Sequence, residues 1–129
     1  MLAFLNRYAD VTYALLRVVA GGMFACHGAQ KLLGAFGGQK AALQSMMGVA
    51  GVIELVGGLL VAVGLFAGVA AFVCSGQMAV AYFMAHAKNG FWPIVNKGEL
   101  AVVYCFLFLY IAARGAGPYS LDAMMRRKP

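Results

Sequence analysis

The chain has 129 residues, of which 64% are hydrophobic and 11% are charged, and its net charge is +6 at pH 7. Soluble domains average about half apolar and a quarter charged residues, so water is not the main solvent here. Each membrane-spanning helix needs about 20 apolar residues, so one domain over residues 1–129 holds four spans and excludes a large soluble domain. The basic residues are scattered singly except at the C-terminus, which excludes nucleic acid as the expected partner and favours lipid headgroups.

The first apolar segment predicts a spanning helix over residues 12–33. Arg7 followed by an apolar run resembles the start of a signal peptide, but the run continues well past Ala25, beyond the length of a signal core. We therefore expect an uncleaved helix. Glycines and polar residues over positions 34–40 end it.

The apolar stretch over residues 46–85 is about twice as long as one crossing requires, so it must fold back on itself. Segment 64–68, which contains two glycines, is the fold-back point. The predicted helices on either side cover about residues 46–65 and 68–86.

A polar connection over residues 87–97 follows and carries Phe91 and Trp92, aromatic residues typical of the membrane surface. A last, short helix is expected over residues 98–114. The sequence therefore predicts an all-α fold, an integral membrane four-helix bundle.

An even number of spans places both termini on one side of the membrane. The basic residues expected at that side are Arg7, Arg114, Arg126, Arg127 and Lys128, with Arg17 as a further candidate, against Lys31, Lys40, Lys88 and Lys97 at the other. Positive charge favours the cytoplasmic side. Both termini are therefore expected in the cytoplasm.

Helical periodicity aligns small and polar residues into one stripe on each predicted helix. The four stripes, in chain order, are Arg17, Gly21, Phe24, Gly28 and Lys31; Glu54, Gly57, Val61, Gly64 and Gly68; Ser75, Met78, Tyr82 and His86; and Glu99, Phe106 and Tyr110. Small residues let helices approach closely, so each stripe indicates a packing face. The charged side chains are then expected to point into the bundle.

The four interior charges, Arg17, Lys31, Glu54 and Glu99, sum to zero, as burial in hydrocarbon requires. One interpretation is structural: Glu54 lies within reach of long side chains from either direction, and ion pairing of Arg17 and Glu54 fixes the helix register. Lys31 and Glu99, near helix ends, can also extend their charged groups to the lipid headgroups.

A second interpretation assigns function to a polar cluster at the outer ends of the helices. His27, Lys31, His86 and Glu99 fall at a similar depth, and Glu54 lies about a third of the way across. We expect the four outer residues to converge in one pocket, where with Glu54 they bind a polar headgroup or move protons, unless the histidines are structural.

The three cysteines, Cys26, Cys74 and Cys105, all lie in apolar segments and show no metal-ligand spacing. Whether Cys26 and Cys105 approach each other stays open. No nucleotide-binding or nucleophile motif is present. The sequence therefore predicts no metal site and no intrinsic cofactor.

The chain resembles the DoxX family of small four-helix membrane proteins over nearly its whole length. The resemblance rests on Arg17 with the segment 27–32, on segments 54–59 and 64–65, and most specifically on residues 90–99 and 115–122. The connection over residues 34–45 is shorter than we expect of many members. The resemblance implies a multi-pass protein of the bacterial inner membrane, an oxidoreductase component linked to quinone-dependent electron transfer. A bound quinone or a partner's cofactor would carry the electrons.

Three functions remain open. The chain is a subunit of a membrane oxidoreductase that contributes a quinone or lipid headgroup site, or a noncatalytic accessory subunit of a larger membrane complex, or, last, a small transporter. The expected partners are membrane lipids and either such a complex or further copies of the chain. Whether the chain is itself an enzyme is left open by the residues.

Overall fold

The computed structural model describes residues 2–126, and every regular element in this range is helical. In chain order the elements are the 3-10 helix η1 (Ala3–Tyr8), α1 (Ala9–Leu33), α2 (Met46–Val52), the π-helix η2 (Ile53–Gly57), α3 (Gly58–Val63), α4 (Ala67–Ala81), the π-helix η3 (Tyr82–His86), the 3-10 helix η4 (Ala87–Asn89), α5 (Pro93–Asn96), α6 (Glu99–Arg114) and α7 (Leu121–Arg126). The all-α membrane fold is confirmed. Arg127 and Lys128, used for the orientation, lie outside the described residues.

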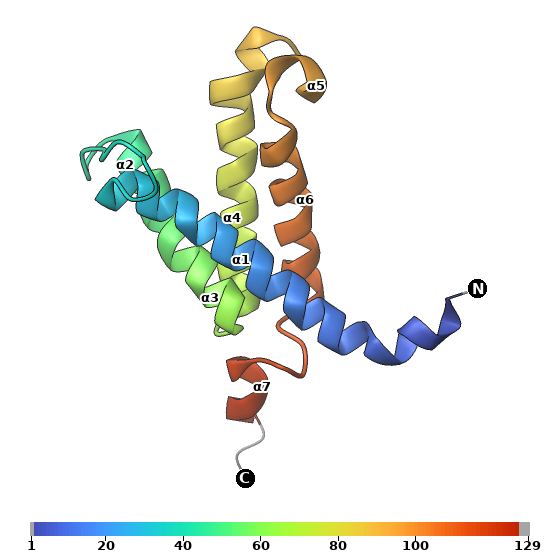
Figure 1. The fold of residues 1–129 in the computed structure, drawn as a ribbon. Coiled ribbons are helices and arrows are strands. Elements are labelled where there is room, and N and C mark those ends of the chain that lie inside the picture. The colour runs from blue at the N-terminus through green and yellow to red at the C-terminus, as the bar shows by residue number, and fades with distance from the viewer. Residues whose placement is uncertain (1, 127–129) are drawn as a thin grey trace.

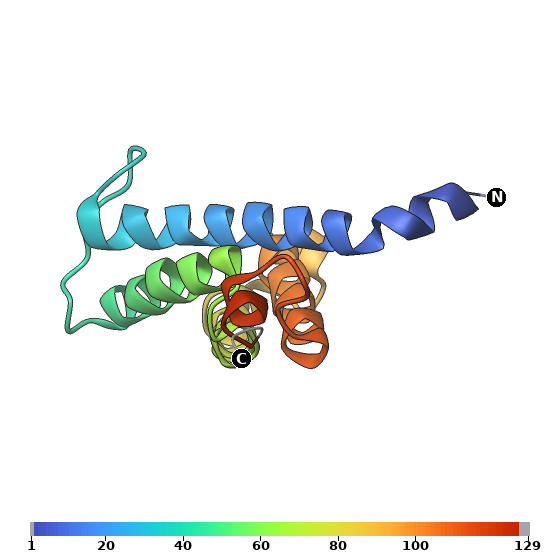
Figure 2. The ribbon, with the colours of Figure 1, turned by 90° about the horizontal axis from the view of Figure 1, so that it is seen from below.

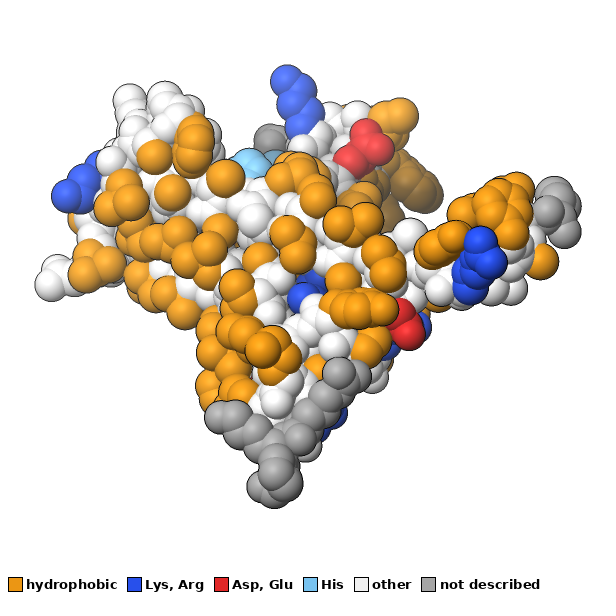
Figure 3. Space-filling model, turned by 60° about the horizontal axis from the view of Figure 1, so that its bottom comes forward, with side chains coloured by type: hydrophobic (Ala, Val, Ile, Leu, Met, Phe, Trp, Pro, Cys, Tyr) orange, Lys and Arg blue, Asp and Glu red, His pale blue; other side chains and the backbone are white. Residues whose placement is uncertain are grey.

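Within residues 2–126, three continuous helical stretches are long and apolar enough to cross a membrane: Ala3–Leu33, Met46–Val63 and Ala67–Asn89. The fourth predicted span is α6, whose 16 residues correspond to about 24 Å at 1.5 Å per residue. Hydrophobic side chains are spread over the whole face shown in Figure 3, with charged groups scattered among them. Lipid, rather than water, is the solvent that such a surface requires.

The fold-back between the second and third spans is confirmed at the predicted segment. Gly64 ends α3 in the left-handed conformation, with φ of 75°, and Phe66 has φ of 49° before α4 begins. The carboxylate of Asp122 accepts hydrogen bonds from the backbone N–H groups of Phe66 and Ala67, at 2.9 and 3.1 Å. Asp122 therefore caps the N-terminus of α4 from a distant part of the chain and fixes α7 beneath the turn.

The helices form two packed pairs. Figures 1 and 2 show α1 lying along the α2–α3 helix, and the neighbouring α4 and α6 crossing α1 obliquely. Glycines bring the first pair together: a Cβ atom at Gly21 would lie 2.6 Å from the carbonyl oxygen of Gly58, and one at Gly28 would lie 2.7 Å from that of Gly51. The glycine stripes are therefore used within the chain.

Aromatic rings fill the crossing of the two pairs. Phe24 of α1 lies 5.1 Å from Tyr104 and 4.8 Å from Phe108, both of α6, measured between ring centroids. Buried Val61 and Ile111 complete this layer. The predicted inward stripes on the first three spans are confirmed, because their members are buried or half-buried.

The stripe predicted for the fourth span is wrong. Glu99 is exposed, and Phe106 and Tyr110 are 65% and 53% exposed. The inward face of α6 is instead formed by Ala101, Tyr104, Phe108 and Ile111. This helix is apolar all round, so periodicity alone gives it no preferred face.

Replacing Asp122 with Ala is expected to destabilise the protein by about 1 kcal/mol, because two N–H groups at the start of α4 lose their acceptor. Thermal unfolding in mild detergent measures the loss, and hydrogen exchange at Phe66 and Ala67 should increase. Asp10 is the control: its 3.3 Å pair with Arg114 is exposed, so Asp10→Ala should leave both readouts nearly unchanged. Equal effects of the two variants would contradict the cap.

Candidate functional site

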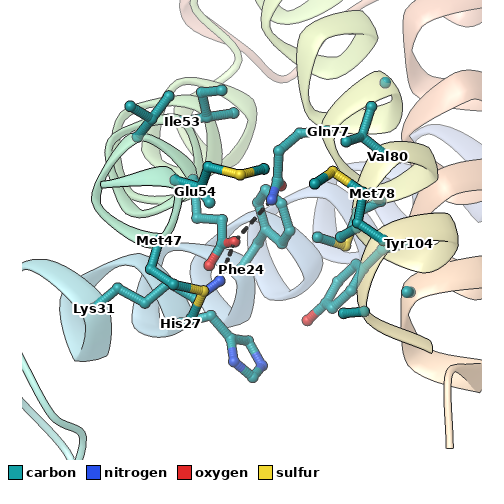
Figure 4. Close-up of a pocket in the computed structure, with 18 of the residues that line it drawn as sticks. Phe24, His27, Lys31, Met47, Ile53, Glu54, Gln77, Met78, Val80 and Tyr104 are labelled. Carbon is teal, nitrogen blue, oxygen red and sulfur yellow. Dashed lines mark hydrogen bonds and ion pairs between the residues drawn. The ribbon is translucent and has the colours of Figure 1, made fainter. Parts of the chain in front are cut away.

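A pocket of about 770 Å³ lies between the two helix pairs, at the end where α2 and η3 diverge. Its walls come from α1, from α2 with η2, from α4 with η3, and from the start of α6. The polar side chains that line it include His27, Lys31, Glu54, Gln77, His86, Lys97 and Tyr104. Figure 4 shows the central part of this arrangement.

Glu54 is the most deeply buried charged group of the pocket, with 1% of the residue exposed. Its Oε2 atom accepts hydrogen bonds from Lys31 Nζ at 2.5 Å and from Gln77 Nε2 at 3.1 Å (Figure 4). Lys31 comes from the last turn of α1 and its side chain is 24% exposed. The ion pair and the hydrogen bond from Gln77 together join three spans around a carboxylate that hydrocarbon alone could not hold in charged form.

Two π-helical turns flank the pocket, and each carries one of its titratable groups. Glu54 lies in η2 and His86 in η3. A π-turn adds a residue to the helical turn and re-aims the side chains that follow, and such turns are frequent at functional sites. Both breaks in α-helical geometry occur on the two helices that diverge around the pocket, one on each side.

Three buried polar atoms of the site have no hydrogen-bond partner within residues 2–126: Glu54 Oε1, Gln77 Oε1 and the Tyr104 hydroxyl. All three side chains line the pocket, from three different helices. An unpaired buried polar group costs about 1–3 kcal/mol, so native proteins rarely leave several together without a function. Their common location indicates a place for a polar group of a ligand.

The two histidines also line the pocket, as predicted. His86 Nδ1 lies 3.2 Å from the carbonyl oxygen of Asn96, which orients the ring. His27 is half-buried, and its ring is nearly perpendicular to that of Tyr104, at 84°, with 6.4 Å between the centroids. Both imidazoles therefore face the same pocket as Lys31, so three members of the predicted outer cluster converge there.

Glu99, the fourth member, does not join them. It is exposed and is absent from the walls of the pocket, which α6 supplies through Leu100, Ala101 and Tyr104. Its assignment to the site is therefore wrong, for the same reason that the stripe on α6 was misplaced. The nearby side chain that does line the pocket is Lys97.

The expected pairing of Arg17 with Glu54 is also wrong. Arg17 is 2% exposed and donates to the carbonyl oxygens of Val61, Ala62, Ala116 and Tyr119, at 2.8, 3.3, 2.5 and 2.9 Å respectively. Two of these carbonyls lie in the last turn of α3, where the helix dipole favours a cation. The end of α3 thus compensates the charge of Arg17 without a carboxylate, and Glu54 pairs with Lys31 instead.

The mouth of the pocket is apolar and lies on the outer surface of the bundle. Met46, Met47, Val49 and Met84 line it, and each is at least half exposed. The pocket therefore opens at the apolar surface of the helices, beside exposed methionine side chains.

Gln77 and Tyr104 are site residues that the sequence reasoning missed. Gln77 is a polar amide in the middle of an apolar span. Polar side chains in a membrane span usually face the interior of the bundle, so the sequence position of Gln77 could have indicated a site residue. Tyr104 gives no such signal, because tyrosine is common in membrane helices. Only the packing of α6 against α1 reveals its position.

The fold and the site together define a helical membrane protein with a pocket between its two helix pairs, around the ion pair of Lys31 and Glu54. A family model, DoxX, matches residues 12–87. The chain belongs to the DoxX family, whose members are small membrane proteins. The resemblance drawn from the residues is thereby confirmed, although segments 90–99 and 115–122 lie beyond the matched range.

A protein of Haemophilus influenzae, described only as an uncharacterized protein, is 44% identical over 131 residues. The similarity covers 96% of this chain and 98% of that protein, so it includes the C-terminal segments that the family match leaves out. No solved structure matches the chain.

Proposed function

We propose that the chain is an inner-membrane subunit of an oxidoreductase assembly and binds the head of a quinone-type lipid in the pocket around Glu54. The observation that carries the proposal is the set of three unpartnered buried polar atoms, Glu54 Oε1, Gln77 Oε1 and the Tyr104 hydroxyl, beside a mouth open to lipid. Both termini are proposed to lie in the cytoplasm.

The pocket suits a ring-sized polar head with an apolar tail. Its volume of about 770 Å³ lies within the usual range for small-molecule sites, about 300–1,000 Å³. Lys31, His27, His86 and Tyr104 can hold oxygen atoms of the head, and the Glu54 carboxylate can accept a hydrogen bond from it. A quinone supplies two-electron chemistry when bound, and a partner subunit is proposed to exchange the electrons with it.

The test fills the pocket without disturbing the packing. Gly76 lines the pocket, and a Cβ atom added there would have no neighbour within 4 Å. Gly76→Phe is therefore expected to reduce binding of a decyl-substituted benzoquinone to the purified protein in nanodiscs at least tenfold, because the ring occupies the space of the head.

Gly22 provides the matched control, because a Cβ atom there also has no neighbour within 4 Å and the residue does not line the pocket. Gly22→Phe should bind the quinone as the unmodified protein does. Wild-type protein that binds neither the quinone nor its hydroquinone would reject the proposed function, and so would equal binding by both variants.

A second candidate, the noncatalytic accessory subunit, is favoured by one observation. Residues 2–12 are all exposed, and Figure 2 shows this part of the chain extending beyond the other helices. Its apolar side chains, among them Phe4 and Leu5, offer a surface to a larger complex or to a second copy. In this case Gly76→Phe would leave the native assembly and its activity intact.

A further inference from the structure

We infer that the pocket selects the reduced, hydroxyl-bearing form of its ligand over the oxidised, carbonyl-bearing form. This inference rests on the proposed function and deepens it, because it concerns which chemical form of the head the site holds. It follows from the kind of hydrogen-bonding groups that the site leaves unpaired.

Two of the three unpaired atoms are acceptors only. Glu54 Oε1 belongs to a carboxylate whose other oxygen accepts from both Lys31 and Gln77. Gln77 directs its NH₂ group at that oxygen, which leaves its own carbonyl oxygen, Oε1, without a donor. The opposite amide orientation would place two acceptors against each other, so the carbonyl oxygen remains the unpaired atom.

The third atom, the Tyr104 hydroxyl, can either donate or accept. The complement of this set is therefore a head that brings hydrogen-bond donors. A hydroxyl group on a ring donates to Glu54 Oε1 and can still accept from Tyr104. A ring carbonyl has no hydrogen to donate, so it leaves the carboxylate oxygen unpaired and adds a repulsive contact between two acceptors.

The three atoms are buried in the pocket wall, so a bound head must move side chains to reach them. Methionines are the residues that would move: Met46, Met47, Met78 and Met84 all line the pocket. Their unbranched side chains have several rotatable bonds and repack at low cost. The ion pair between Lys31 and Glu54 can therefore stay in place while the head enters.

The experiment compares three ligands of matched shape on the full-length protein in nanodiscs, under anaerobic conditions: a decyl-benzoquinone, its hydroquinone, and the dimethyl ether of that hydroquinone. We expect the hydroquinone to bind at least tenfold more tightly than the other two, because only it carries donors. A tenfold preference also raises the two-electron midpoint potential of the bound couple by about 30 mV, which redox titration measures.

Glu54→Gln gives a reversed outcome. The amide oxygen of the new glutamine takes over the contacts with Lys31 and Gln77. Its NH₂ group, a hydrogen-bond donor, then lies where the acceptor Glu54 Oε1 was. This variant is expected to bind the quinone at least as tightly as the hydroquinone. Glu99→Gln is the control, since Glu99 is exposed and outside the pocket, and it should keep the preference for the hydroquinone.

The outcomes separate the two proposals. If the wild-type protein binds none of the three ligands, the proposed function fails. If it binds the quinone or the dimethyl ether as tightly as the hydroquinone, the proposed function stands and the inference is overturned. The ligand comparison needs only the wild-type protein, so it decides the inference even if Glu54→Gln does not fold. The headgroup of an ethanolamine lipid also carries hydrogen-bond donors, so this lipid is added as a competitor. If it displaces the hydroquinone at equal concentration, the site is assigned to lipid headgroups.

Discussion

Replacing Arg17 with Met is expected to destabilise the protein by about 3 kcal/mol, because buried carbonyl oxygens on two segments lose their donor together. The guanidinium joins the end of α3 to the C-terminal segment through Val61, Ala116 and Tyr119. Methionine keeps most of the side-chain length and removes all donors, so the loss reports on hydrogen bonding rather than on volume. Thermal unfolding in mild detergent measures it.

Arg114→Met is the control, because its ion pair with Asp10 is exposed on both sides, at 37% and 56%, and such surface pairs contribute little to stability. Glu54→Gln should also cost less than Arg17→Met, since an amide keeps the contacts with Lys31 and Gln77. A loss on Arg17→Met no larger than that on Arg114→Met would contradict the role given to the carbonyl cluster.

The second large effect concerns two adjacent glycines of α1. Gly21→Ala is expected to cost about 2 kcal/mol, because its Cβ atom would lie 2.6 Å from the carbonyl oxygen of Gly58 and 2.7 Å from the backbone nitrogen of Ala62. Neither backbone atom can move without separating α1 from α3. The unfolding temperature of the protein in mild detergent is the measurement.

Gly22→Ala should have the opposite sign. A Cβ atom at Gly22 meets nothing within 4 Å, and alanine is favoured over glycine in a helix by about 1 kcal/mol. The pair of variants therefore separates close helix packing from the general effect of adding a methyl group. Equal changes in stability at both positions would show that the α1–α3 contact is not as tight as described.

Where the chain alternates between small, polar and apolar residues, sequence was enough to predict the fold. The fold-back near Gly64 follows from apolar length, because no single helix of a membrane protein needs 40 apolar residues. The inward faces of α1, the α2–α3 helix and α4 follow from their glycines and charges, since burial of these groups has few alternatives in lipid. The pocket residues His27, Lys31, Glu54 and His86 were found by the same reasoning.

The partners of the charges and the face of α6 were decided by the tertiary structure. Arg17 takes backbone carbonyls because the end of α3 and the segment around Ala116 meet beside it, an arrangement that no local pattern encodes. Figure 1 shows α4 and α6 crossing α1 obliquely. In this packing Tyr104 is buried and Glu99 is exposed. Periodicity identifies which residues share a face, but an apolar helix in lipid can turn any face inward, so packing against its neighbours makes the choice.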